Sequence, residues 1–262
     1  MIYFQYILVG IFGLIVGSFL NSVIYRLQSI DDIKKIFTHR SHCPKCKETL
    51  RFWDLIPLVS FIFLRAKCRY CQKPISWQYP LVEVATALIF LSIFFQYGLS
   101  WETLVWAIIA AILVVVFTYD LLHSEIPVFL VYIGLVLAVI LVLLNIYHKG
   151  IFDWREGLNY VYGALCIGGF LGLLVLVSRE KWMGIGDIWL GAFVGLLLTW
   201  QLAIVAGFFA FVVGSIISLI LISAKKKKFK DKIPFGPFLI VGLLVALIWG
   251  EQIINWYLKG AY

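Results

Sequence analysis

The amino-acid sequence predicts an all-α polytopic membrane protein with about eight transmembrane helices and one small loop domain outside the bilayer. Of the 262 residues, 63% are hydrophobic and only 14% are charged, and the mean hydropathy is +0.98. These values are far too apolar for a soluble globular domain. Apolar runs of about 20 residues, the length that a helix needs to cross a bilayer, recur along the chain. One sizeable polar segment, residues 26–79, separates the first run from the second.

Eight apolar runs are the predicted transmembrane helices. Because no Lys or Arg precedes Arg26, the first run lacks the basic start of a cleaved signal peptide, and we expect a retained helix. The sixth and seventh runs almost fuse at residues 199–201, and no internal repeat is visible. The runs cover residues 5–25, 80–97, 102–119, 126–146, 158–178, 186–200, 202–223 and 236–257.

Positive charge predicts which ends of these helices face the cytoplasm. With eight crossings, the loops 26–79, 120–125, 179–185 and 224–235 share one side and hold 19 of the 22 Lys and Arg residues. An excess of these residues marks the cytoplasmic side of a membrane protein. We therefore expect these loops in the cytoplasm and both termini outside. The net charge of +8 then reflects orientation and contact with anionic lipid, and we expect no nucleic-acid partner.

The long polar segment contains two Cys-x2-Cys pairs, whose members are Cys43, Cys46, Cys68 and Cys71. Two such pairs can place four thiolates tetrahedrally around one Zn²⁺, and a metal compensates for the small core of so short a loop. A reducing cytoplasm argues against disulfides. Four sulfur ligands leave no open coordination position, so we predict a structural zinc. The alternatives are a redox pair, or His39 or His42 in place of one cysteine.

Residues 54–64, between the two cysteine pairs, are too few to cross a bilayer and too apolar to lie in water. This length predicts an interfacial or re-entrant helix that docks the zinc module on the membrane. The expected domains are therefore a first transmembrane helix over residues 1–25, a cytoplasmic four-cysteine zinc module over 26–79, and a seven-helix membrane domain over 80–262.

Two aspartates at predicted helix ends are the leading catalytic candidates. Asp120 closes the third run, and Asp187 follows Gly184 and Gly186 in a Gly-x-Gly-Asp sequence that opens the sixth. A carboxylate at a bilayer boundary is costly and is a functional candidate by default. Neighbouring carboxylates share a proton, so one can accept a proton from water while the other donates to a carbonyl. The glycines allow a peptide backbone to approach closely. The alternative is that each aspartate caps a helix or pairs with a cation such as Lys181.

Supporting candidates lie near the same predicted boundary. Glu83, inside the second run, could pair with Arg26 or Arg69, or serve a second site. The segment that opens the eighth run, residues 233–238, combines Pro234, Gly236 and Pro237. Prolines around a glycine predict a rigid, non-helical segment whose free backbone groups could hold a substrate, although a simple helix start fits equally well.

Taken together, these features closely resemble the bacterial type IV prepilin peptidases, the leader peptidase/N-methyltransferase family of membrane aspartyl proteases. The resemblance runs in order along nearly the whole chain, and no single motif carries it. The matching stretches are residues 17–27, 43–46, 54–57, 68–71, 79–83, 120–127, 183–187 and 233–239.

The resemblance implies that Asp120 and Asp187 are the catalytic pair of an endopeptidase over residues 80–262 in a bacterial plasma membrane. Its substrates would be prepilins or pseudopilins of a type IV pilus, competence or secretion system. They would be cut at the cytoplasmic face between a short basic leader and an apolar helix. The resemblance further implies N-methylation of the new N-terminal residue, with S-adenosylmethionine as donor. No glycine-rich nucleotide loop is visible. We therefore expect the site of the methyl donor somewhere in the cytoplasmic loop or its flanks, and the sequence does not narrow it further.

One residue departs from the family pattern. The family commonly has a lysine two residues after the second aspartate, where this chain has Trp189. Two rival interpretations share the composition: a non-catalytic, zinc-bearing membrane scaffold for pilus or secretion assembly, and a transporter with a relay of Asp120, Glu83 and Asp187. A relay favours carboxylates near the middle of the bilayer, whereas these lie at predicted helix ends.

Overall fold

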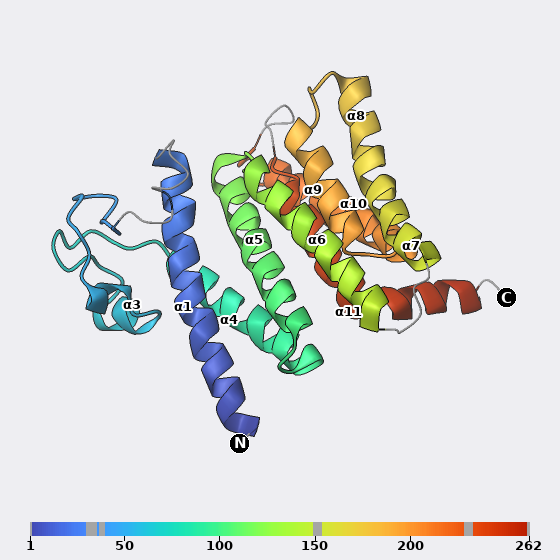
Figure 1. Ribbon diagram of the computed structural model, residues 1–262. Helices are drawn as coiled ribbons and strands as arrows, with labels where there is room; N and C mark the ends of the chain where they lie inside the picture. The colour runs from blue at the N-terminus through green and yellow to red at the C-terminus, as the bar shows by residue number, and fades with distance from the viewer. Residues whose placement is uncertain (1, 30–35, 37–39, 149–153, 228–232, 261–262) are drawn as a thin grey trace. The chain divides into compact units, whose positions relative to one another are not determined.

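The computed structural model describes residues 2–29, 36, 40–148, 154–227 and 233–260, and it divides into two compact units, Met1–Val115 and Val116–Tyr262. The described residues form helices and no strand, apart from two isolated β-bridges in the cysteine-rich loop (Figure 1). The predicted all-α class is confirmed.

Seven helical segments among the described residues are long and apolar enough to cross a membrane. They agree with seven of the eight predicted runs, usually with one to several more residues at the ends. The elements are α1 (Ile2–Ser29), η1 (Phe52–Leu55), α3 (Val59–Phe63), α4 (Gln78–Tyr97), α5 (Trp101–His123), α6 (Val128–His148), α7 (Trp154–Ala164), η2 (Leu165–Gly169), α8 (Phe170–Ser178), α9 (Ile185–Leu196), α10 (Trp200–Ser223) and α11 (Gly236–Gly260).

The sixth predicted crossing, residues 186–200, is shorter than expected. Helix α9 ends at Leu196 after 12 residues, and α10 begins at Trp200. Twelve residues span about 18 Å, whereas the hydrocarbon core is about 30 Å thick. Leu190 and Phe193 on α9 are completely buried, so protein rather than lipid covers most of this helix. A helix enclosed in this way need not match the thickness of the bilayer.

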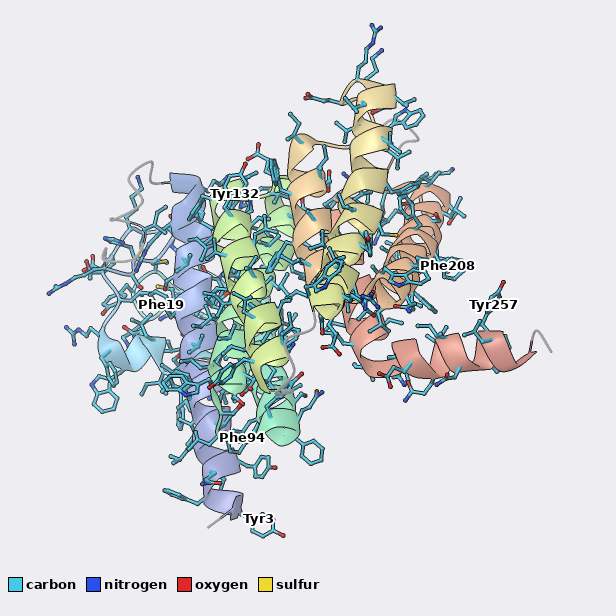
Figure 2. The ribbon with its side chains drawn as sticks, turned by 45° about the vertical axis from the view of Figure 1, so that its right-hand side comes forward. Tyr3, Phe19, Phe94, Tyr132, Phe208 and Tyr257 are labelled. Atoms are coloured by element: carbon cyan, nitrogen blue, oxygen red, sulfur yellow. The ribbon has the colours of Figure 1, made fainter. Side chains whose placement is uncertain are left out.

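In the first unit, α1 and α4 pack tightly along each other. A Cβ atom at Gly13 would lie 2.6 Å from the Ala87 Cα, so only glycine permits this approach of the two backbones. Aromatic pairs extend the contact, including Tyr6 with Phe94 at 5.2 Å between ring centroids. Phe94 is marked on α4 in Figure 2. The tight α1–α4 pair is the support from which the cysteine-rich loop extends.

In the second unit, α9 lies between α6 and α8 (Figure 1). The helix that precedes it in sequence runs from α7 to α8 through η2, a π-helical turn. Gly168 in this turn faces Ala192 of α9, with only 3.0 Å between a Cβ at Gly168 and the Ala192 Cα. Small residues on both sides therefore let α9 enter the centre of the unit, and this packing fixes the direction in which its N-terminus points.

Candidate functional site

Asp120 lies in the last turn of α5, which continues for one more turn than predicted and ends at His123. The side chain is buried, with 3% of the residue exposed. Its Oδ2 accepts a hydrogen bond of 3.0 Å from the backbone N–H of Gly236, the first residue of α11. The first N–H groups of a helix have no partner within the helix, and the helix dipole favours negative charge there. The start of α11 therefore holds one oxygen of Asp120.

Asp187 lies in the first turn of α9 and is also buried, with 9% exposed. Its Oδ2 accepts a hydrogen bond of 2.9 Å from the Gly184 N–H, immediately before the helix. The cap predicted as the alternative role of this aspartate is thus present. A cap at a helix start also fixes the position of the carboxylate, and one of its oxygens is left for other partners.

Asp120 and Asp187 lie in the same part of the second unit, because Asp187 is in the first turn of α9 and Asp120 is held by the first residue of α11, which packs against α9. Asp120, Asp187 and Gly236 come from three segments that are far apart in sequence, and all three belong to the second unit. Leu190 of α9 also contacts the Gly236 position, so the starts of α9 and α11 meet beside Asp120. Among the described residues, no salt bridge joins Lys181 to either aspartate. Neighbouring buried carboxylates can share a proton, as acid–base hydrolysis of a peptide requires.

The Gly-x-Gly-Asp sequence is closed in by the loop after α5. A Cβ atom at Gly186 would lie 3.0 Å from the Ile126 Cβ, which makes glycine the residue that fits. Trp189, at the position where the resemblance led us to expect a lysine, makes an edge-to-face contact with Tyr132 of α6 at 5.2 Å between centroids. Figure 2 marks Tyr132 on this helix. Trp189 is therefore a packing residue of the α6–α9 interface.

Residues 233–238 were predicted either to hold a substrate through free backbone groups or simply to start a helix, and α11 starts at Gly236. Pro234 lies just ahead of this helix, and Pro237 is buried in its first turn. A Cβ at Gly236 would approach the Asp120 Oδ2 to 2.6 Å. The sequence did not predict that the Gly236 N–H donates to Asp120. Its one relevant signal was a glycine between two prolines, which indicated an unusual backbone conformation.

The four cysteines come together in the first unit. Their sulfur atoms all lie within 4.8 Å of one another, and Cys43 Sγ and Cys71 Sγ are 4.0 Å apart. Tetrahedral zinc with bonds of about 2.3 Å to sulfur needs sulfur atoms slightly less than 4 Å apart. His42 is not needed to complete this group, and His39 lies outside the described residues. The residues fit a four-sulfur metal centre.

The two cysteine pairs have the same backbone conformation, a structural repeat that the sequence analysis missed. The Lys47 N–H donates to the Cys43 carbonyl at 2.8 Å, and the Gln72 N–H donates to the Cys68 carbonyl at 3.0 Å. Lys47 and Gln72 both have positive φ, 58° and 57°. The repeat is hard to see in the sequence because the two copies share their cysteines and turn conformations but few other residues.

The environments of the sulfurs also favour a bound cation. Although burial disfavours its charge, the Cys43 thiol has its pKa lowered to about 7 by hydrogen bonds from the backbone of Cys46 and Lys45. The backbone of Glu48 favours the Cys46 thiolate, but desolvation and the neighbouring Cys43 and Cys71 raise the pKa of Cys46 to about 11. Thiols this close cannot all ionise without a positive charge between them, which a metal ion supplies.

A polar network fastens this module to the helices of its own unit. Glu83 of α4 is buried and accepts a hydrogen bond of 2.9 Å from the Leu58 N–H. Arg69, one of the predicted partners of Glu83, instead pairs with Asp54 at 2.7 Å. Arg26 donates to the Ile36 carbonyl at 2.9 Å. Glu83 therefore positions the segment before α3.

These features describe a polytopic helical protein with two buried aspartates at helix ends and a cluster of four cysteines that could hold a metal ion. Residues 11–97 match the bacterial peptidase A24 N-terminal domain, and residues 107–219 match the type IV leader peptidase family. The chain belongs to the type IV leader peptidase family.

Three relatives illustrate the similarity, and each is named prepilin leader peptidase/N-methyltransferase. The protein from Legionella pneumophila is 32% identical over 98% of this chain and 95% of its own length. The protein from Pseudomonas aeruginosa is 31% identical over 95% of this chain and 92% of its own. The protein from Bacillus subtilis is 30% identical over 96% of this chain and 97% of its own. No solved structure is significantly similar to the chain.

Proposed function

We propose that this protein is a membrane aspartyl endopeptidase that removes the leader of type IV prepilins or pseudopilins and then methylates the new N-terminal residue. The observation that carries the proposal is the buried pair Asp120 and Asp187, each held through one oxygen by a backbone N–H at a helix start. The names of full-length relatives support both activities.

Hydrolysis by such a pair needs no covalent intermediate. One carboxylate is ionised and accepts a proton from water as the water oxygen bonds to the scissile carbonyl carbon. The protonated carboxyl donates its proton to the carbonyl oxygen, which gives a tetrahedral diol. The carbon–nitrogen bond then breaks as the leaving amine takes the proton of one carboxyl group, while the other carboxylate takes a proton from a diol hydroxyl. The diol carbon becomes the carboxyl carbon of the product, and the pair again holds one proton. The hydrogen bonds from Gly236 and Gly184 orient both carboxyl groups for these transfers.

The four cysteines would hold a structural Zn²⁺, because four sulfur ligands leave no position for water or substrate. S-adenosylmethionine, when bound, supplies the methyl group for the α-amine that cleavage exposes. The metal would keep the two cysteine pairs folded, and the module would dock on the bilayer through exposed apolar side chains. Ile62 and Phe63 of α3 are 71% and 82% exposed, and Trp77 ahead of α4 is 70% exposed.

We place both aspartates at the cytoplasmic ends of their helices in the bacterial plasma membrane, with both termini outside. The bond between Asp120 and Gly236 supports this orientation, because it brings the end of α5 and the start of α11 to one face of the second unit. The loops 120–125, 179–185 and 224–235 then share that face. Although α9 is short, α10 still begins at the end of α9 that is remote from Asp187. The predicted alternation of helix directions across the membrane is therefore unchanged. Substrates with a basic leader and an apolar helix would reach this face from the lipid.

A cleavage assay tests the proposal. The full chain in proteoliposomes is given a peptide with a basic leader, a glycine, and then phenylalanine and an apolar run, and the products are analysed by mass spectrometry. Cleavage after the glycine, followed by the mass of one added methylene in the presence of S-adenosylmethionine, is the expected result. Binding of the leader without cleavage by folded protein would instead favour a non-catalytic scaffold for pilus or secretion assembly.

A further inference from the structure

A cavity of about 740 Å³ lies within the first unit, between α1, the two cysteine pairs, the segment from η1 to α3 and the start of α4. Pockets for ligands of cofactor size typically enclose about 300–1,000 Å³. All of its lining residues fall between positions 18 and 83, so the cavity contains neither Asp120 nor Asp187. The peptidase chemistry leaves this cavity without a role.

Asn21 of α1 gives the cavity wall a buried polar group with unused capacity. Only 2% of the residue is exposed, and its Nδ2 donates a hydrogen bond of 3.0 Å to the Tyr79 carbonyl. Within the part of the chain that the structure describes, the Asn21 Oδ1 has no hydrogen-bond partner. An acceptor left unpaired in the interior destabilises a protein, and a ligand with an N–H or O–H donor removes that penalty.

Glu83 adds a second acceptor to the same wall. It is 6% exposed, and one carboxylate oxygen accepts the Leu58 N–H. A carboxylate has about four lone-pair sites, so this bond leaves acceptor capacity for a ligand. Tyr25, Phe61 and Tyr79 also line the cavity, and aromatic ring faces attract a neighbouring positive charge. These groups favour a ligand that combines several donors with a cationic centre.

The remaining charged groups of the lining are mostly basic. Arg26 is 7% exposed, while Arg40 and Lys73 are exposed. Basic groups favour a carboxylate or a phosphate. The phosphodiester of a lipid headgroup satisfies them, but it has no N–H or O–H donor of its own for the Asn21 Oδ1. A zwitterionic amino acid joined to a donor-rich, cationic group satisfies both sets.

We propose that this cavity binds S-adenosylmethionine, with Asn21 and Glu83 accepting hydrogen bonds from its amine or hydroxyl donors, the aromatic rings facing its sulfonium, and the arginines facing its carboxylate. The proposal rests on the methyl-transfer activity proposed above and locates its donor site. Because Cys43 and Cys68 also line the cavity, the metal centre supports one of its walls.

The test is direct binding of radiolabelled S-adenosylmethionine to the full, zinc-loaded chain in lipid nanodiscs. Asn21→Leu and Glu83→Gln should each weaken binding by about tenfold or more, which corresponds to about 1.4 kcal/mol. The glutamine in the second variant can still accept the Leu58 N–H, so that change removes charge and keeps the loop contact. Asn145→Leu is the matched control, since Asn145 lies on α6 and outside the cavity. It should leave the affinity unchanged, and all three variants should still cleave the leader peptide.

The ligand-induced rise in melting temperature gives a second readout that does not depend on activity. It should disappear in Asn21→Leu while the melting temperature of the ligand-free protein and its zinc content remain. Unchanged affinity for S-adenosylmethionine in both cavity variants would overturn the proposal. The same conclusion would follow if the variants lost a bound anionic lipid but still bound S-adenosylmethionine normally. A wild type that cleaves but neither binds the donor nor methylates would refute the methyl-transfer function itself, whereas methylation with normal binding in both variants would refute only this location.

Discussion

The two units build their sites in opposite ways. In the first unit, two short turns bring four sulfurs within 4.8 Å, and each turn is made by residues that are neighbours in the sequence. In the second unit, Asp120, Asp187 and Gly236 come from the ends of three different helices, and backbone N–H groups hold the carboxylates. On the proposed function, the first site depends on a metal and the second on close helix packing. We infer that mutations can separate the two sites and their chemistries.

The largest effect is expected at the aspartates. Asp120→Asn and Asp187→Asn keep the side-chain shape and the acceptor oxygen for Gly236 or Gly184. Each replaces one carboxyl group with an amide, so the pair can no longer share a proton. Because positioned acid–base groups contribute about 10²–10⁴-fold to a rate, cleavage should fall by at least that factor. The measurement is kcat/KM on the leader peptide in proteoliposomes. Binding of S-adenosylmethionine should be unchanged, and substantial cleavage by either variant would remove the paired mechanism.

The next largest effect should follow Gly236→Ala. A Cβ at this position would lie 2.6 Å from the Asp120 Oδ2, so the carboxylate or the start of α11 must move. A displacement of about 1 Å can cost about 10²-fold in rate, and we expect a loss of cleavage of that order. Gly207→Ala on α10 is the control, since a Cβ there meets nothing within 4 Å. Equal rates for the two variants would show that the bond to Asp120 does not position it.

Loss of zinc should damage the first unit selectively. Cys43→Ser, Cys71→Ser or treatment with a strong chelator should abolish the bound metal, which elemental analysis measures, and with it most binding of S-adenosylmethionine. Cleavage should stay within about threefold of wild type per folded molecule, because the aspartates belong to the other unit. If all four Cys→Ser changes leave metal content, fold and both activities intact, the structural-zinc proposal is wrong.

The smallest effect is expected at Trp189. Edge-to-face aromatic pairs contribute about 0.5–1.5 kcal/mol beyond their buried area, so Trp189→Ala should lower the stability of the second unit by at least about 1 kcal/mol. Trp189→Phe should retain most of the contact with Tyr132. Thermal unfolding in detergent measures both changes. Cleavage should change only a few-fold in either variant, and a loss as large as that of Asp187→Asn would show that Trp189 takes part in catalysis.

The cysteine module and most helices could be predicted from sequence because their signals are local. Apolar length predicts a crossing helix, and the spacing of Cys43, Cys46, Cys68 and Cys71 predicts one metal centre. The short α9 could not be recognised in this way. Its Leu190 and Phe193 are as apolar as lipid-facing residues, and only the structure shows that protein surrounds them.

The aspartate site depends on contacts that sequence does not state. Asp120 and Asp187 were candidates because of their places at helix ends, and their meeting was inferred from a resemblance along the whole chain. The bond from Gly236 spans 116 positions of sequence, and no local pattern predicts it. In the same way, the unpaired oxygen of Asn21 becomes visible only once α1, α4 and the cysteine loop enclose a cavity.

The most direct test of separable sites is one mass-spectrometric assay of cleavage and methylation with wild type, Asp187→Asn and Asn21→Leu. All three proteins receive the same leader peptide and S-adenosylmethionine. Wild type should give a cut and methylated product, Asp187→Asn no cut product, and Asn21→Leu a cut product without the added methylene. Cleavage by Asp187→Asn, or loss of cleavage together with methylation in a folded, zinc-loaded Asn21→Leu, would contradict the division of function between the two units.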